Sequence, residues 1–155
     1  MADLNDHILV LLDASTLDES AVRSARELVN PGGRVTLLLT RSPSEPGPLG
    51  DFAASENLSV PDAAEIYVQR TVRRLRAEGV VAEPVSVPGG RTAAGVVWNA
   101  QRRGVTLILL AAEDRPRRKL FGRGLAQQLV AASPVPVLVA PRPGRRRDEP
   151  ALAAA

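Results

Sequence analysis

One loop holds most of the residues that could bind an anion. Between residues 113 and 124 the chain carries five cations and two glycines: Arg115, Arg117, Arg118, Lys119, Arg123, Gly122 and Gly124. Guanidinium groups bind phosphate in a bidentate manner, and glycine allows a backbone to approach an anion closely. The loop therefore suits a phosphate group, although the same cations could equally form a solvated segment without a ligand.

A few carboxylates are the other candidates for chemistry. Asp13 follows an apolar run and could either contact a nucleoside or, like Ser15, cap the helix that follows. Glu113 and Asp114 could hold a Mg²⁺ ion that accompanies a nucleotide, but adjacent side chains diverge and do not suit acid-base catalysis. Because the chain has one histidine, His7, and no cysteine, most zinc sites, Ser-His schemes and thiol chemistry are excluded.

Two apolar runs must position these residues. Val105 to Ala112 leads into the cationic loop, and Ile8 to Leu12 leads into Asp13. Runs without charge or alternation are typical of strands that are buried on both faces of a parallel sheet. In such sheets ligands bind at the carboxyl ends of the strands, where helix N-termini point their N–H groups at anions. The sequence therefore predicts one crevice framed by the ends of these two strands.

The rest of the chain alternates between strand and helix patterns. Further strands are predicted over 35–39, 80–87 and 135–139, and helices over 18–29, 59–78, 92–103 and 125–132. Pro84 and Pro136 place two of the strands at sheet edges or strand starts, because proline cannot donate to a ladder. Residues 42–59 are rich in proline and glycine and have no period, which predicts a long irregular loop that could serve as a lid. Right-handed crossovers then give an α/β fold with a five-stranded parallel sheet and helices on both faces.

The charge is distributed unevenly along the chain. Residues 1–114 carry a net charge of −4, and residues 115–155 carry a net charge of +7. We expect one domain over 1–142 and a basic, disordered tail over 143–155, which is either a solvated extension or an element that docks on nucleic acid. The sequence shows no secretory signal and no apolar run of roughly 18 residues, so we expect a cytoplasmic protein without a membrane partner.

In this order and spacing the residues resemble the universal stress protein family, over residues 5 to 141. The resemblance is carried by Ile8 to Asp13 with Ser15, Ala21 and Ala25, Gly90, Val105 to Leu110, and Pro134 to Val139. It implies a doubly wound, Rossmann-like sheet in the order 3-2-1-4-5, with an adenine-nucleotide crevice at the ends of strands one and four. It also implies a homodimer made through the last strand, with contacts from Val135, Val137 and Val139.

The phosphate loop departs from the pattern of the ATP-binding members. In those members the loop after strand four follows Gly-x2-Gly-x9-Gly-[Ser/Thr]. Aligned on the strand, the glycine positions become Ala111, Asp114 and Gly124, and Leu125 replaces the hydroxyl residue; aligned from the last strand backwards, the final pair becomes Arg123-Gly124. Side chains at positions 111 and 114 would crowd the backbone cradle, and a carboxylate would repel phosphate. The resemblance therefore implies a degenerate ATP-binding loop.

The resemblance also implies a set of nucleotide contacts, namely Leu12, Asp13, Ala14, Ser15, Thr40, Ala111, Ala112, Asp114, Arg115, Arg123, Gly124 and Leu125. The expected cofactor is ATP or AMP, with Mg²⁺ beside ATP, unless the degenerate loop abolishes binding. We rank first a regulatory stress-response homodimer with weak or absent ATP binding and a protein partner. An ATP or AMP sensor that uses the arginine-rich loop comes second, and a nucleic-acid-associated protein third. We expect at most a very weak ATPase.

Overall fold

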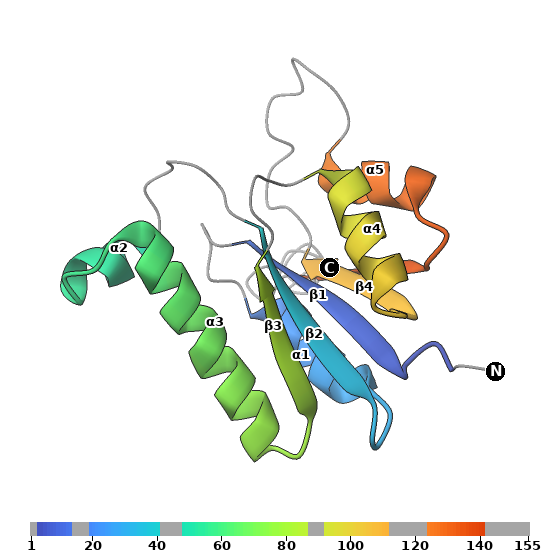
Figure 1. Ribbon diagram of the computed structural model, residues 1–155, viewed down its shortest axis with the longest axis horizontal. Coiled ribbons are helices and arrows are strands. Elements are labelled where there is room, and N and C mark those ends of the chain that lie inside the picture. The colour runs from blue at the N-terminus through green and yellow to red at the C-terminus, as the bar shows by residue number, and fades with distance from the viewer. Residues whose placement is uncertain (1–2, 14–18, 41–47, 87–91, 112–123, 142–155) are drawn as a thin grey trace, which may run out of the picture.

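The computed structural model describes residues 3–13, 19–40, 48–86, 92–111 and 124–141. Strands and helices alternate in these segments, with one additional helix after the second strand (Figure 1). In chain order the elements are β1 His7–Asp13, α1 Ser20–Leu28, β2 Arg34–Thr40, α2 Pro48–Ser55, α3 Val60–Ala77, β3 Val81–Ser86, α4 Ala93–Arg102, β4 Leu107–Ala111, α5 Leu125–Ala132 and β5 Val137–Ala140.

The five strands form one parallel sheet in the order β3-β2-β1-β4-β5. The predicted fold class and strand order are confirmed. The two apolar runs, β1 and β4, are neighbours, with Ile8 opposite Leu107 and Leu11 opposite Leu110. Their lack of charge follows from this position, because helices cover both faces of the sheet.

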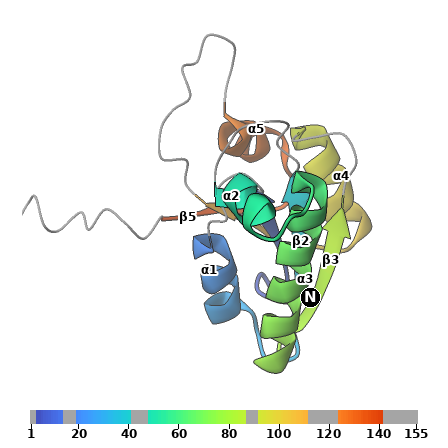
Figure 2. The same cartoon turned by 90° about the vertical axis from the view of Figure 1, so that its left-hand side faces the viewer.

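Helices cover the sheet on both faces (Figures 1 and 2). On one face α1, α2 and α3 pack over Ile8, Val10 and Leu12 of β1, and Leu75 of α3 is 1% exposed. On the other face α4 and α5 pack over Leu9 and Leu11. Each buried leucine, isoleucine or valine contributes about 1.5–3 kcal/mol relative to an exposed one, so the alternating sides of β1 hold the two layers together.

The predicted helix limits have local causes. The hydroxyl of Ser59 accepts a hydrogen bond from the Asp62 backbone N–H at 3.2 Å, and proline follows in the first turn of α3. Thr92 caps α4 in the same way, through the backbone N–H of Gly95 at 3.1 Å. After α3 the chain turns at Gly79, whose φ of +85° favours glycine.

The prediction of an irregular loop over 42–59 is wrong for residues 48–55, while residues 42–47 lie outside the described residues. Pro48–Ser55 is a helix, α2, which lies beside the start of α3 (Figure 1). Leu49 and Ala53 are 3% and 2% exposed and belong to the core, while the Arg70 guanidinium lies 5.4 Å from the ring centroid of Phe52. The packing of its apolar residues outweighs the unfavourable glycine at position 50. A helix held in the core in this way is not a lid.

Both strands with a proline nearby lie at the edges of the sheet, as predicted. Pro84 is within β3, and Pro136 precedes β5, which begins at Val137 rather than at residue 135. The strand before the cationic loop is also shorter than predicted, because β4 begins at Leu107. Within the described segments, none of the helices is both long and apolar enough to cross a membrane.

Candidate functional site

The carboxyl ends of the three central strands meet at one edge of the sheet. Leu11 of β1 pairs with Leu110 of β4, and Asp13 pairs with Thr40 of β2. The strand pairing confirms that the two apolar strands lie side by side and parallel. In open α/β sheets, ligands bind outside this edge.

The structure describes only part of the predicted site. The side chain of Leu12 is 2% exposed and packs into the core, so this residue can offer only its backbone to a ligand. The backbones of Asp13 and Thr40 lie at neighbouring strand ends. Ala111 is half-buried at the end of β4. The other predicted contacts before α5, including both carboxylates proposed for Mg²⁺, lie outside the described residues: Ala14, Ser15, Ala112, Glu113, Asp114, Arg115 and Arg123.

The helix that follows the cationic loop begins without a side-chain cap. Gly124 is the N-cap residue of α5, and its carbonyl accepts a hydrogen bond from the Gln128 backbone N–H at 3.1 Å. Leu125 is partly buried and packs against the core layer under α4 and α5. The first residue of this helix therefore points an apolar group at the protein interior and offers no hydroxyl to a phosphate.

A small hollow lies near the same edge of the sheet. Its volume is about 110 Å³, and its lining comes from β2, β3 and α3: Leu39, Glu65, Val68, Gln69, Pro84 and Val85. Sequence reasoning missed Glu65 and Gln69, although their four-residue spacing places both on one side of α3. Pockets for small ligands usually measure about 300–1,000 Å³, so the hollow can hold only part of a nucleotide.

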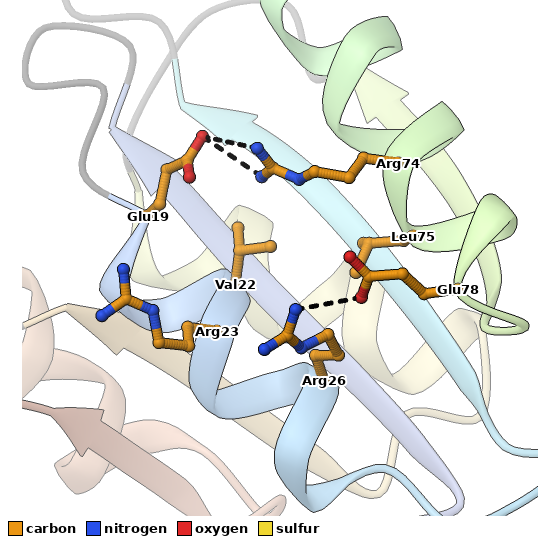
Figure 3. A pocket seen from close by; sticks show the side chains of 7 residues that line it. All are labelled: Glu19, Val22, Arg23, Arg26, Arg74, Leu75 and Glu78. Carbon is orange, nitrogen blue, oxygen red and sulfur yellow. Dashed lines mark hydrogen bonds and ion pairs between the residues drawn. The ribbon is translucent and has the colours of Figure 1, made fainter.

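A second hollow, of about 200 Å³, lies between α1 and α3 and is lined by charged residues around an apolar floor (Figure 3). The figure shows two ion pairs that bridge the helices: Arg74 to Glu19 and Arg26 to Glu78, both at 3.1 Å. Val22 and Leu75 form the floor. The lining holds three arginines and two glutamates, so the two ion pairs leave a net charge of +1, from Arg23, at the groove.

Metal-ligating side chains do not gather in the described part of the chain: no group of three or more histidine, aspartate or glutamate side chains is placed to hold an ion. The single tryptophan, Trp98, is 57% exposed on α4, and the Arg102 guanidinium lies 5.1 Å from its ring centroid. This contact fits a surface residue rather than a residue that stacks on a base.

Known structures share this fold. The chain aligns with hypothetical protein MJ0577, a test case of structural genomics, with a TM-score of 0.69 and 20% identity over 92% of this chain and 100% of that one. It also aligns with a universal stress family protein from Arabidopsis thaliana with AMP bound, with a TM-score of 0.64 and 15% identity over 94% and 97% of the two chains. A universal stress protein in complex with cAMP gives a TM-score of 0.58 and 14% identity over 90% and 98%.

A comparison with curated protein sequences found no match. The model of the universal stress protein family, in contrast, matches residues 5–141, which is most of the chain. The matched range covers every strand of the sheet and the edge where β1, β2 and β4 end. The chain therefore belongs to the universal stress protein family.

Proposed function

We propose that this chain is a regulatory universal stress protein that works as a homodimer and binds adenine nucleotides weakly or not at all. The observation that carries the proposal is the start of α5, where Leu125 packs against the core and no side chain caps the helix. A hydrogen bond to a charged group contributes about 1.5–3 kcal/mol, so the loss of one phosphate contact weakens binding by roughly 10- to 150-fold.

The nucleotide class comes from the solved relatives. One was determined with AMP bound and another in complex with cAMP. Both ligands carry a single phosphate, which needs fewer hydrogen-bond donors from the protein than a triphosphate does. We therefore expect any remaining affinity to be for the nucleoside and its first phosphate, at the end of β1, and not for the phosphate chain of ATP.

Isothermal titration with ATP-Mg and with AMP tests this function. We expect no saturation by ATP-Mg at micromolar concentrations, and binding of AMP no weaker than that of ATP. A micromolar constant for ATP that is lost in Asp13→Ala would overturn the proposal and favour the sensor, in which the arginine-rich loop holds the phosphates. Salt-dependent retention of DNA or RNA on filters, with a flat nucleotide titration, would favour the nucleic-acid function.

The dimer is proposed from the free edge of β5. Among the described residues this strand pairs with β4 alone, and Leu138 and Val139 are each 41% exposed. Val135 and Val137, which we also expected at the interface, pack partly against the core. An edge strand with unpaired backbone groups and exposed apolar side chains is a template for pairing with another strand. A second copy of β5 provides the same length and the same apolar side chains.

A further inference from the structure

We propose that His7, Thr36 and Glu83 form a proton-responsive switch across β1, β2 and β3, in which proton uptake by His7 turns the Thr36 hydroxyl from the imidazole to the carboxylate. The three side chains lie away from the strand ends that form the candidate site. The inference goes beyond nucleotide binding and does not depend on it.

The contacts between the three side chains are short and mostly shielded from water. His7 is 8% exposed and Thr36 is 0% exposed. His7 Nε2 lies 2.7 Å from Thr36 Oγ1, and that hydroxyl lies 3.2 Å from Glu83 Oε1. Thr36 and Glu83 are direct neighbours in the pairing of β2 with β3. The chain of contacts therefore runs from a buried ring to a half-exposed carboxylate.

The number of protons allows only one direction of hydrogen bonding at a time. A threonine hydroxyl has one proton to donate, whereas a neutral imidazole has one N–H and an imidazolium has two. The backbone of Arg103 also raises the pKa of His7 as a hydrogen-bond partner, which favours a ring that directs an N–H toward it. With Nε2 facing Thr36, the second ring nitrogen is the one available to Arg103.

Two arrangements follow from these constraints. In the neutral ring the proton faces Arg103, so bare Nε2 accepts the Thr36 proton and Glu83 receives none. In the charged ring Nε2 donates to Thr36, whose proton is then free to reach Glu83. Protonation of His7 therefore changes the hydrogen bonding of a carboxylate two strands away.

The surrounding charges set the range in which the switch works. Burial is the main cause that lowers the pKa of His7 from its usual 6.5, and the positive charges of Arg34 and Arg103 lower it further. The carboxylate of Glu83 and the backbone contact with Arg103 act in the opposite direction. The Arg103 guanidinium also lies 3.9 Å from the Glu83 carboxylate. The two residues therefore form an ion pair beside His7, and each of them influences the pKa of its ring. Because the pKa of His7 lies below 6.5, the ring is neutral at pH 7.5 and takes up its proton only at a lower pH than an ordinary histidine.

Nuclear magnetic resonance titration of the full chain from pH 8 to pH 4.5 tests the switch directly. His7 is the single histidine, so its ring signals need no further assignment. We expect a midpoint below 6.5 and an inflection of the Glu83 carboxyl carbon at the same pH.

Two variants test the contacts of His7, and the first of them separates the hydrogen-bond relay from simple charge proximity. Thr36→Val keeps the shape of the side chain but removes the hydroxyl, and we expect the Glu83 inflection at the His7 midpoint to shrink at least twofold. Glu83→Gln removes a half-exposed charge that attracts the proton, so the His7 midpoint falls. Glu78→Gln, which removes a carboxylate paired with Arg26 elsewhere, leaves the midpoint unchanged.

The inference is overturned if His7 titrates at or above 6.5, or if the Glu83 inflection keeps its full size in Thr36→Val. It is also overturned if Glu83→Gln leaves the His7 midpoint where it was. Should Thr36→Val not fold, Thr36→Ala removes the same hydroxyl and takes its place in the comparison.

Discussion

At the level of single residues, Leu125 determines what the start of α5 can do. Its side chain packs with the layer that contains Leu129 and Ala100, so the position contributes to stability. A hydroxyl residue there would give up part of that packing and gain a donor at the sheet edge. Leucine at this position thus contributes a contact with the core, where a hydroxyl residue would contribute a contact with a phosphate.

A second single residue, His7, makes the free energy of unfolding depend on pH. Its pKa is lower in the folded chain than the usual 6.5, mainly because of burial, so the unfolded chain binds the proton more tightly. The contribution of neutral His7 to the free energy of unfolding is fully present above pH 6.5. It is lost as the pH falls through the pKa of His7 in the folded chain. We expect urea denaturation to give a lower free energy of unfolding at pH 5 than at pH 7.5.

His7→Gln is the matched control for that measurement, because glutamine can still donate to Thr36 but does not titrate. Its free energy of unfolding should change less between the same two pH values. A native chain that becomes more stable in acid, or a His7→Gln variant with the same slope as the native chain, would contradict the assignment.

At the level of elements, the two edges of the sheet differ in how they are protected. The β3 edge contains Pro84, which has no N–H, and the Ala82 carbonyl accepts a hydrogen bond from Arg76 Nε at 2.9 Å. The β5 edge has no proline within the strand and exposes Leu138 and Val139. Of these two described edges, the β5 edge is therefore the one that we propose for pairing with another strand.

A matched pair of substitutions tests this difference. Val139→Glu places a charge on the β5 edge, whereas Val81→Glu places the same charge on the β3 edge, where the valine is 51% exposed. Light scattering after gel filtration should show the native chain and Val81→Glu as dimers and Val139→Glu as a monomer. A dimer that survives Val139→Glu would place the interface elsewhere.

The ion pairs between α1 and α3 should contribute little to stability. The paired side chains are between 35% and 48% exposed, and exposed pairs contribute about 0.2–1 kcal/mol. Glu19→Gln or Glu78→Gln should therefore lower the free energy of unfolding by less than about 1 kcal/mol. Leu75→Ala, beneath the same groove, should lower it by about 2–5 kcal/mol in urea denaturation. Equal losses from the two kinds of variant would show that the groove depends on its charges.

Elements with an unbroken pattern could be predicted from the sequence, and elements held by distant contacts could not. From their apolar runs, β1 and β4 could be predicted as buried neighbouring strands, and α5 was predicted with its observed limits. The helix at Pro48–Ser55 was missed because proline and glycine hid the spacing of Leu49, Phe52 and Ala53. The polar chain that begins at His7 joins residues 29 and 47 positions apart, which no local pattern shows.

At the level of the whole molecule, the proposed nucleotide site, the proposed dimer contact and the polar chain of His7 lie at different places on the parallel sheet. The carboxyl ends of β1, β2 and β4 form the proposed nucleotide edge, β5 forms the proposed dimer edge, and the polar chain crosses β1, β2 and β3. A protein of this kind can change its oligomeric surface without changing its nucleotide edge. The fold is shared with proteins that are 14–20% identical, and in this chain α5 begins with an apolar residue, Leu125.

Titration of three chains with ATP-Mg, namely the native chain, Leu125→Ser and Leu125→Ala, tests the central claim most directly. Serine restores a hydroxyl at the start of α5, whereas alanine removes the same packing and restores nothing. We expect Leu125→Ser to bind ATP at least about 10-fold more tightly than Leu125→Ala, which should resemble the native chain. Micromolar binding by the native chain, or equal constants for the serine and alanine variants, would contradict it.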